Sequence, residues 1–290
     1  MINRNYREGE QLDVAGLNKI IVLIDRSETE ITEVGWNCWT PKQDGPPHKH
    51  NDKDQVFYIT GGVGKVRLGD KQYDVKPGNM VYVPAGLVHQ TITTTEERLC
   101  YLLYNVFNNP DKEGHSTFAE HIEKVKQIRR QQADTGSSTV DEEKIMTGVK
   151  SSKFLVDIYF GKKYEFGSNS AQLLIDRGES NNTEVTLVSW SAGSKGAVIA
   201  HKEKEQTFFI LKGNGKISVG EETGEVQPGN LVFVPRNMAH TTEAGEEGLT
   251  YLCMNAIIHP ELYSSFDEMY NQVSAGRIER WNSGSNEAGE

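Results

Sequence analysis

The chain repeats itself at a constant spacing of 151 positions, and this repeat limits its fold more than any other feature of the sequence. Turn-forming, aromatic and polar residues of the first half recur in the second half. The matched pairs are Asp25 with Asp176, Arg26 with Arg177, Trp39 with Trp190, His50 with His201, Gln55 with Gln206, Phe57 with Phe208, Gly62 with Gly213, Gly64 with Gly215, Pro77 with Pro228, Gly78 with Gly229, Asn79 with Asn230, Pro84 with Pro235 and His89 with His240. One register held over such a span indicates a tandem duplication. We therefore expect two domains of one kind.

Each half of the chain has the pattern of a small antiparallel barrel followed by a helix. Short β-rich segments separated by Pro and Gly occur at 19–24, 32–39, 55–59, 64–68, 80–83 and 98–104, and again at 173–175, 184–190, 207–211, 231–234 and 249–254. Apolar residues at helical spacing predict a helix over 116–130 and another after Pro260. The predicted domains are 1–130 for the N-terminal barrel with its helix, 131–150 for a linker and 151–282 for the C-terminal barrel with its helix.

The composition is that of a soluble globular protein. A formal net charge of −10 argues against nucleic-acid and anionic-membrane partners. No stretch approaches the ~20 apolar residues of a membrane-spanning helix, and the start lacks the apolar core of a signal peptide. We expect a cytoplasmic protein with a small-molecule substrate, and a homodimer remains open. Cys38, Cys100 and Cys253 have no motif spacing, so we expect reduced, half-buried packing residues.

Three histidines and a glutamine of the first half have spacings that can converge on one metal ion. His48 and His50 are two apart, so in an extended segment both side chains point to the same face. Gln55 opens the next strand, and His89 lies on a later one. Three imidazole nitrogens with one amide oxygen leave coordination positions open for substrate or water. The competing interpretation is a chance cluster of surface histidines, or a histidine that satisfies a buried polar group.

These residues resemble the motifs of the cupin superfamily. Its first motif carries His-x-His and a fourth ligand before a strand and a glycine, matched here by His48, His50, Gln55 and Gly62. Its second motif, Pro-x-Gly-x-x-His, is matched by the run that ends at His89. The resemblance implies a bicupin, an all-β fold with a few helices, built from tandem double-stranded β-helix (jelly-roll) barrels. It also implies one divalent metal ion per chain, Zn, Ni, Mn, Co or Fe, in the N-terminal barrel.

Two departures from the cupin pattern bear on the chemistry. Gln55 stands where many cupin oxygenases and decarboxylases carry Glu, so a bound ion keeps more positive charge and no carboxylate ligand serves as a base. In the second half, Ile199 stands opposite His48. The matched residues that remain are His201, Gln206 and His240, which form a candidate second metal site. Because two imidazoles and an amide bind a metal weakly, we expect the second barrel to be empty.

The His-His-Gln-His set resembles that of cupins that open unsaturated uronates or isomerise small carbonyl compounds. The leading hypothesis is therefore Lewis-acid isomerisation or ring opening of a sugar or sugar acid. For that reaction, Tyr104 is the candidate proton relay and Arg67 the candidate partner of a substrate carboxylate. Two alternatives stay open. One is a quercetinase-like dioxygenase with Fe on the three histidines, and the other is a non-catalytic bicupin that binds a metal or a sugar.

Overall fold

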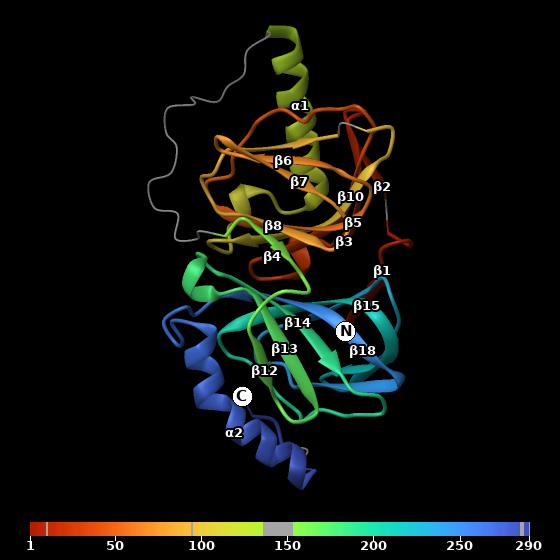
Figure 1. Ribbon diagram of the computed structural model, residues 1–290. Coiled ribbons are helices and arrows are strands. Elements are labelled where there is room, and N and C mark those ends of the chain that lie inside the picture. Colours follow the sequence, from red (N-terminus) through yellow and green to blue (C-terminus); the bar gives the residue numbers. More distant parts are fainter. Residues whose placement is uncertain (10, 94, 136–152, 285–286, 290) are drawn as a thin grey trace. The chain divides into compact units, whose positions relative to one another are not determined.

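The computed structural model describes residues 1–9, 11–93, 95–135, 153–284 and 287–289 (Figure 1). The chain forms two compact units. The first unit comprises Gly9–Tyr159, and the second comprises Met1–Glu8 together with Phe160–Glu290. Strands dominate both units, as the sequence predicts.

The first unit is built from two antiparallel sheets. The larger has the strand order β11-β8-β5-β10-β4-β3-β2, and the smaller has the order β7-β6-β9. The strands are β2 (Gln11–Val14), β3 (Asn18–Ile24), β4 (Thr32–Trp39), β5 (Lys53–Gly61), β6 (Gly64–Leu68), β7 (Lys71–Val75), β8 (Asn79–Val83), β9 (His89–Ile92), β10 (Leu99–Phe107) and β11 (Leu155–Asp157). Side chains alternate between the faces of each strand, so one face of both sheets supplies the buried core. Phe57, Val66, Val81 and Leu103 belong to that core.

The second unit has one antiparallel sheet with the order β1-β17-β15-β18-β14-β13-β12, and β16 pairs with β15. The strands are β1 (Ile2–Asn5), β12 (Lys163–Glu165), β13 (Asn169–Ile175), β14 (Thr183–Trp190), β15 (Lys204–Val219), β16 (Glu222–Val226), β17 (Asn230–Val234) and β18 (His240–Ile257). The long strands β15 and β18 span the positions that form β5 with β6, and β9 with β10, in the first unit. Register shifts near Lys212 and Gly215 interrupt the β15 pairing with β18, as β-bulges do where a strand bends.

Two strands join a different unit from the one that sequence order suggests. β1, near the start of the chain, pairs with β17, and Ile2 lies opposite Phe233. β11 pairs with β8, and Leu155 lies opposite Val81. Each barrel therefore takes one strand from beyond the domain bounds that the sequence predicts. Of the expected linker 131–150, the first five residues belong to a helix and the rest lie outside the described residues.

A helix follows each barrel, as helical spacing predicts. They are α1 (Phe118–Thr135) and α2 (Phe266–Ser283). Asp25 accepts a hydrogen bond from the backbone N–H of Phe118 at 2.9 Å, and Asp176 does the same for Phe266 at 3.2 Å. A carboxylate at this position satisfies a free N–H and complements the helix dipole. Phe118 and Ile122 pack against β2 and β3. Across the described residues, no helix combines the length and apolar character needed to cross a membrane.

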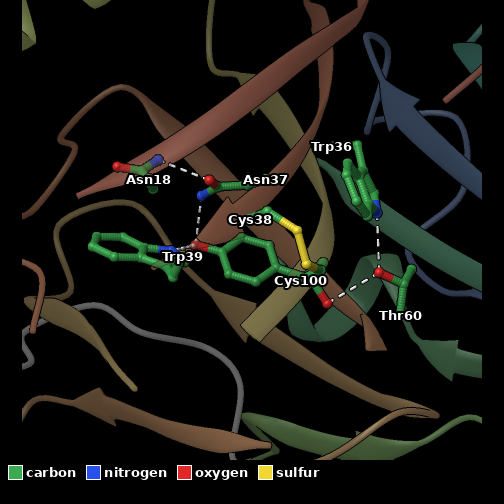
Figure 2. The surroundings of a disulfide bond; sticks show 8 residues. Asn18, Trp36, Asn37, Cys38, Trp39, Thr60 and Cys100 are labelled. Atoms are coloured by element: carbon green, nitrogen blue, oxygen red, sulfur yellow. Dashed lines mark hydrogen bonds between the residues drawn. A yellow bond between two sulfur atoms is a disulfide. The ribbon is translucent and has the colours of Figure 1, made fainter. Parts of the chain in front are cut away.

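A disulfide joins Cys38 on β4 to Cys100 on β10 (Figure 2). The antiparallel register places the two residues opposite each other, with Cα atoms 4.2 Å apart. The expectation that both are reduced is therefore wrong, because their spacing in the sequence does not reveal this register. Cys253 is free and buried, and burial raises the pKa of its thiol to about 12. The equivalent pair in the second unit is Ser189 and Thr250.

Candidate metal centre

His48, His50 and His89 face one point inside the first unit. Their ligand atoms all lie within 4.8 Å of one another. The ring centroids of His48 and His89 are 4.2 Å apart, and the ring of His50 lies 5.1 Å from His48 and 5.6 Å from His89. Within the part of the chain that the structure describes, this is the one group of three or more His, Cys, Asp or Glu side chains with such spacing. The fold thus brings together the three histidines that the sequence singles out.

Backbone pairing holds this triad. His48 and His89 exchange both of their backbone hydrogen bonds, at 3.0 and 2.8 Å. The backbone N–H of Gly86, where the second cupin-like motif turns, donates to the carbonyl of His50 at 2.6 Å. Gly86 has a φ of +84°, a conformation that glycine adopts without the cost of a Cβ. The turn before β9 therefore fixes the position of all three histidines.

The local hydrogen bonds leave the histidines ready to act as ligands. Nδ1 of His48 lies 3.0 Å from the carbonyl of Pro46, and Nδ1 of His89 lies 3.2 Å from the carbonyl of Leu87. A carbonyl oxygen can only accept, so in the neutral form of each ring Nδ1 carries the proton and Nε2 keeps its lone pair. Burial, and then the neighbouring His48 and His50, hold the pKa of His89 well below its ordinary value. A neutral imidazole is the form that binds metal.

Gln55, on β5, lies in the same cavity as the triad. Its side-chain N–H donates to Oδ1 of Asn105 at 2.9 Å, and Asn105 donates to Glu33 at 2.7 Å. Glu33 in turn accepts from Nε of Arg26 in a fully buried ion pair. Oε1 of Gln55 is buried and has no hydrogen-bond partner among the described residues. A buried amide oxygen without a hydrogen-bond donor, beside three imidazole rings, makes a ligand set that fits a divalent metal ion.

The second unit repeats this relay of hydrogen bonds. Gln206 donates to Asn255 at 2.9 Å, Asn255 donates to Glu184 at 2.8 Å, and Arg177 binds both oxygens of Glu184. Oε1 of Gln206 is likewise buried without a partner in the described structure. Asn255 lies 150 positions after its counterpart in the first unit, one fewer than the spacing of the repeat. A search at the constant spacing of 151 therefore passes over the asparagine that orients the glutamine.

The candidate ligands lie in a cavity of about 300 Å³. Ligand pockets span ~300–1,000 Å³, so this one suits a small organic molecule. Strands of the first unit and one side of α1 line it. The apolar lining residues are Val14, Ile20, Trp39, Phe57, Leu103, Phe118, Ile122, Val125 and Ile128. The charged lining residues among those described are Glu33, Lys49, Lys53 and Lys124. The exposed surface of this cavity is thus mostly apolar, with imidazole, amide, hydroxyl and ammonium groups set within it.

A tyrosine network also belongs to this lining. The hydroxyl of Tyr101 accepts hydrogen bonds from Asn37 and from the indole of Trp39, both at 2.9 Å. Asn18 donates to Asn37 at 2.7 Å, and the hydroxyl of Thr91 lies 3.4 Å from that of Tyr101. The disulfide joins the same two strands, β4 and β10, at adjacent positions. The network and the disulfide together hold this side of the cavity.

Tyr104 and Arg67, the catalytic candidates of the sequence analysis, do not line the cavity. Tyr104 is fully buried on β10, but Leu103 and Asn105 are the neighbours whose side chains face the cavity. Because side chains alternate along a strand, Tyr104 points to the opposite face. Arg67, on β6, donates from Nε to the carbonyl of Gly69 at 3.0 Å. The structure places neither residue to act on a molecule bound at the triad.

The corresponding pocket of the second unit is smaller, at about 90 Å³. His201, Gln206 and His240 line it, and the two imidazole rings lie 5.4 Å apart. Ile199 forms the backbone bridge to His240 that His48 forms to its partner in the first unit. The structure thus brings the candidate second-site residues together, with an aliphatic side chain where the first unit has its third imidazole.

Cationic side chains surround the histidines of this second pocket. Burial and then Lys204 and Arg277 hold the pKa of His201 well below its ordinary value. Burial is also the main reason why the pKa of His240 falls to about 4. Arg277 and Trp281, both from α2, line the pocket. Lys204 is paired with Glu203 at 3.2 Å, so the positive charge of Arg277 is the main one that opposes the binding of a cation here.

Two further histidines reach the first cavity from the side of α1. The ring centroid of His121 lies 6.4 Å from that of His50 and 5.8 Å from that of His115. The sequence analysis missed both. Position 121 falls on the apolar stripe of the helix, three residues after Phe118 and four before Val125, so helical spacing could have revealed it. The position of His115 depends on the loop before the helix, which spacing does not fix.

Comparisons with known proteins agree with this architecture. A family model described as the cupin domain matches residues 36–105 and 186–255. Quercetin 2,3-dioxygenase of Bacillus subtilis (strain 168) is 24% identical over 256 residues, which cover 80% of this chain and 74% of that protein. An uncharacterized protein of Streptomyces coelicolor is 34% identical over 71 residues, 24% of this chain and 67% of that protein. The solved structure of oxalate decarboxylase from Bacillus subtilis aligns with a TM-score of 0.62 and 17% identity over 90% of this chain and 79% of its own, a likeness of fold.

Proposed function

Since the chain belongs to the cupin superfamily and carries two tandem cupin domains, we propose that its first domain is a metal-dependent dioxygenase of a planar aromatic hydroxy-carbonyl compound. The observation that carries this proposal is the apolar wall around the histidines and Gln55. A sugar would place hydroxyl groups against aliphatic side chains, and each buried group left without a partner costs ~1–3 kcal/mol. A flat aromatic ring gains from the same surface.

His48, His50, His89 and Gln55 are the residues that would hold the ion. When bound, the ion supplies positive charge that favours deprotonation of a substrate hydroxyl, and redox activity where Fe, Mn or Co is used. Oxalate decarboxylase of Bacillus subtilis has Mn(II) centres, which supports manganese as one candidate. The relative with 24% identity acts on quercetin, which supports a phenolic substrate.

The chain's own residues bind and orient the substrate. Phe57 stacks on Tyr101, with ring centroids 4.7 Å apart and an interplanar angle of 27°, so both rings are held in place. Lys53 is 1% exposed yet lines the cavity, and its charge favours an anionic oxygen on the substrate. The aliphatic side chains on the inner side of α1 exclude water from the bound ring.

One observation favours a second candidate function. Gln55 stands in place of the carboxylate ligand, so no ligand can take up the proton of the substrate hydroxyl. A neutral donor set strengthens the Lewis acidity of the ion, which favours isomerisation or ring opening without oxygen. This second candidate keeps the metal site and changes only the reaction.

Oxygen uptake separates the two functions. Protein loaded with Fe(II), Mn(II), Co(II) or Ni(II) is mixed with quercetin or 3-hydroxyflavone in an oxygen electrode, and labelled dioxygen traces oxygen into the product. We expect uptake with incorporation of both oxygen atoms, abolished by His50→Ala and retained by the matched variant His201→Ala. Substrate turnover without oxygen uptake would transfer support to isomerisation. No turnover with any ion, or equal loss in both variants, would refute the proposal.

A further inference from the structure

The two helices that follow the barrels can be aligned residue by residue. Ser116 donates from its backbone N–H and its hydroxyl to Glu120, and Ser264 does the same to Glu268. The first helical residue of each is held by an aspartate of its own barrel, as described above. Ser264 follows Ser116 by 148 positions, so this spacing relates α1 to α2. In this alignment, α1 presents side chains to its cavity that α2 lacks.

Three nitrogen-bearing side chains that α1 and the loop before it bring to the first cavity have no equivalent in the second unit. They are His115, His121 and Lys124, and the second unit carries Tyr263, Met269 and Gln272 in their places. Met269 lines the second pocket where His121 lines the first. We call His115, His121 and Lys124 the helix basic row. Both barrels have the relay of hydrogen bonds that begins at Gln55 or at Gln206, so that relay belongs to the shared fold. The helix basic row occurs only at the first cavity.

The helix basic row forms a connected series that begins beside the triad. His121 is the member closest to a candidate ligand, with its ring centroid 6.4 Å from that of His50. His115 follows at 5.8 Å from His121. Nζ of Lys124 lies 3.3 Å from Nε2 of His115, where the ammonium donates and the imidazole accepts. His115 and His121 are half-buried and Lys124 is exposed, so the row leads from the triad to the cavity rim.

The charges of the cavity favour an anion at this row. Glu33 is the one acidic side chain among the described lining residues, and Arg26 and Asn105 already occupy its oxygens. Glu120, on the same helix, accepts from Ser116. Two more lysines of the lining add to the positive potential of the cavity. A carboxylate meeting an ammonium and an imidazole N–H makes charge-assisted hydrogen bonds, which are shorter and stronger than neutral ones.

We propose that the helix basic row is a carboxylate-binding subsite of the first cavity. The substrate is then an aromatic acid whose hydroxy-carbonyl oxygens lie at His48, His50 and His89 and whose carboxylate lies at His121 and Lys124. That the substrate is aromatic and has its hydroxy-carbonyl oxygens at the three histidines rests on the proposed function. The carboxylate subsite follows from the residues of the helix basic row. The second unit has methionine and glutamine at the two positions, so it lacks this subsite.

A matched pair of ligands tests the subsite without turnover. 3-Hydroxyflavone and 4′-carboxy-3-hydroxyflavone share the chelating group and differ by one carboxylate. Calorimetric titration of the Mn(II)-loaded protein without oxygen gives both dissociation constants, and benzoate is titrated into metal-free protein as an independent probe. We expect the carboxylated flavone to bind about tenfold more tightly than its parent. Benzoate binding is expected to be weak but measurable.

The variants take their side chains from the second helix. His121→Met and Lys124→Gln should reduce the preference for the carboxylated flavone to about unity and abolish benzoate binding, while metal content and binding of 3-hydroxyflavone stay unchanged. Lys124→Arg should restore the preference, and Gln272→Lys should have no effect. Benzoate binding that depends on the row, without binding of either flavone, would support the subsite and refute the proposed substrate. If the wild type bound both flavones equally, or if both variants kept the preference for the carboxylated flavone, the proposed subsite would be wrong.

Discussion

Gln55 donates its side-chain N–H to Asn105 across 2.9 Å, and this one contact decides which atom of the amide is left for the cavity. With the nitrogen engaged, Oε1 is the remaining polar atom, and it is buried without a hydrogen-bond partner among the described residues. Glu33 and Arg26 continue the relay. Because each group fixes the orientation of the next, the fold presents an oxygen, not an N–H, beside three imidazole rings.

Removing the orienting asparagine should weaken metal binding without removing any ligand. In Asn105→Leu the side-chain N–H of Gln55 loses the oxygen that accepts its hydrogen bond, so the amide can rotate. The carboxylate of Glu33 loses the N–H that Asn105 donates to it. Loss of such an outer contact costs roughly 10- to 100-fold in metal affinity. Competition with a chelator of known affinity measures the change. The matched variant Asn255→Leu should leave affinity unchanged, and an equal loss there would contradict the assignment of the metal to the first unit.

The second unit should gain a metal when its missing ligand is supplied and its neighbouring cation is removed. Ile199→His provides the third imidazole, and Arg277→Met removes a guanidinium whose charge lowers the pKa of both pocket histidines. The double variant is expected to raise the metal content by about one ion per chain, because three imidazoles and an amide oxygen suffice for a site. Elemental analysis after reconstitution measures it. A double variant with the metal content of the wild type would show that other features keep this pocket metal-free.

Metal-free protein should lose stability below pH 6.5. The pKa values of His89, His201 and His240 are all depressed in the folded chain, that of His240 to about 4. Above pH 6.5 these groups are neutral in both states, so their contribution to stability is fully present. As the pH falls, the unfolded chain takes up protons that the folded chain refuses, and each histidine lowers the free energy of unfolding by about 1.4 kcal/mol per pH unit until its folded pKa is reached.

Urea unfolding at pH 7.5, 6.5 and 5.5 in the presence of a chelator checks this dependence. In His240→Gln one titrating histidine is lost, so the free energy of unfolding should fall less steeply with decreasing pH below 6.5. Above pH 6.5 its dependence on pH should stay unchanged. A free energy of unfolding that did not change between pH 6.5 and 5.5 would be inconsistent with three buried neutral histidines.

The disulfide should stabilise the first unit alone. Cys38→Ser with Cys100→Thr introduces the pair that the second unit carries as Ser189 and Thr250. The bond closes a loop with a sequence separation of 62, and loss of a disulfide typically costs about 2–4 kcal/mol. Urea unfolding with and without dithiothreitol measures the effect. The reductant should destabilise the wild type by the same amount and leave the double variant unchanged; a wild type insensitive to reductant would contradict the prediction.

Local patterns predicted much of the fold and the centre of the site. Residue types at fixed spacing were enough to pair the two halves, to place most strands and both helices, and to single out His48, His50, Gln55 and His89. These features follow from alternation along a strand and from one motif turn, both of which are short-range. The disulfide, the β1 and β11 pairings and the position of His115 at the cavity depend on contacts between distant segments or on a loop, so spacing did not reveal them.

The position of Tyr104 has a similar origin. β10 pairs with β4 without a register shift from Leu99 to Val106, so its side chains alternate regularly. Residues 101, 103 and 105 face the cavity, and Tyr104 faces away. Spacing in the sequence does not say which face of a strand is turned toward a cavity, because that depends on the pairing register.

The sharpest test of a single metal centre in the first cupin domain is the metal content per chain, measured on reconstituted wild type and on one matched pair of variants. His89→Ala removes a ligand of the proposed centre, and His240→Ala removes its counterpart in the second unit. We expect about one divalent ion per chain in the wild type and in His240→Ala, and almost none in His89→Ala. An ion that stays in His89→Ala, or that is lost in His240→Ala, would contradict a single metal centre in the first cupin domain.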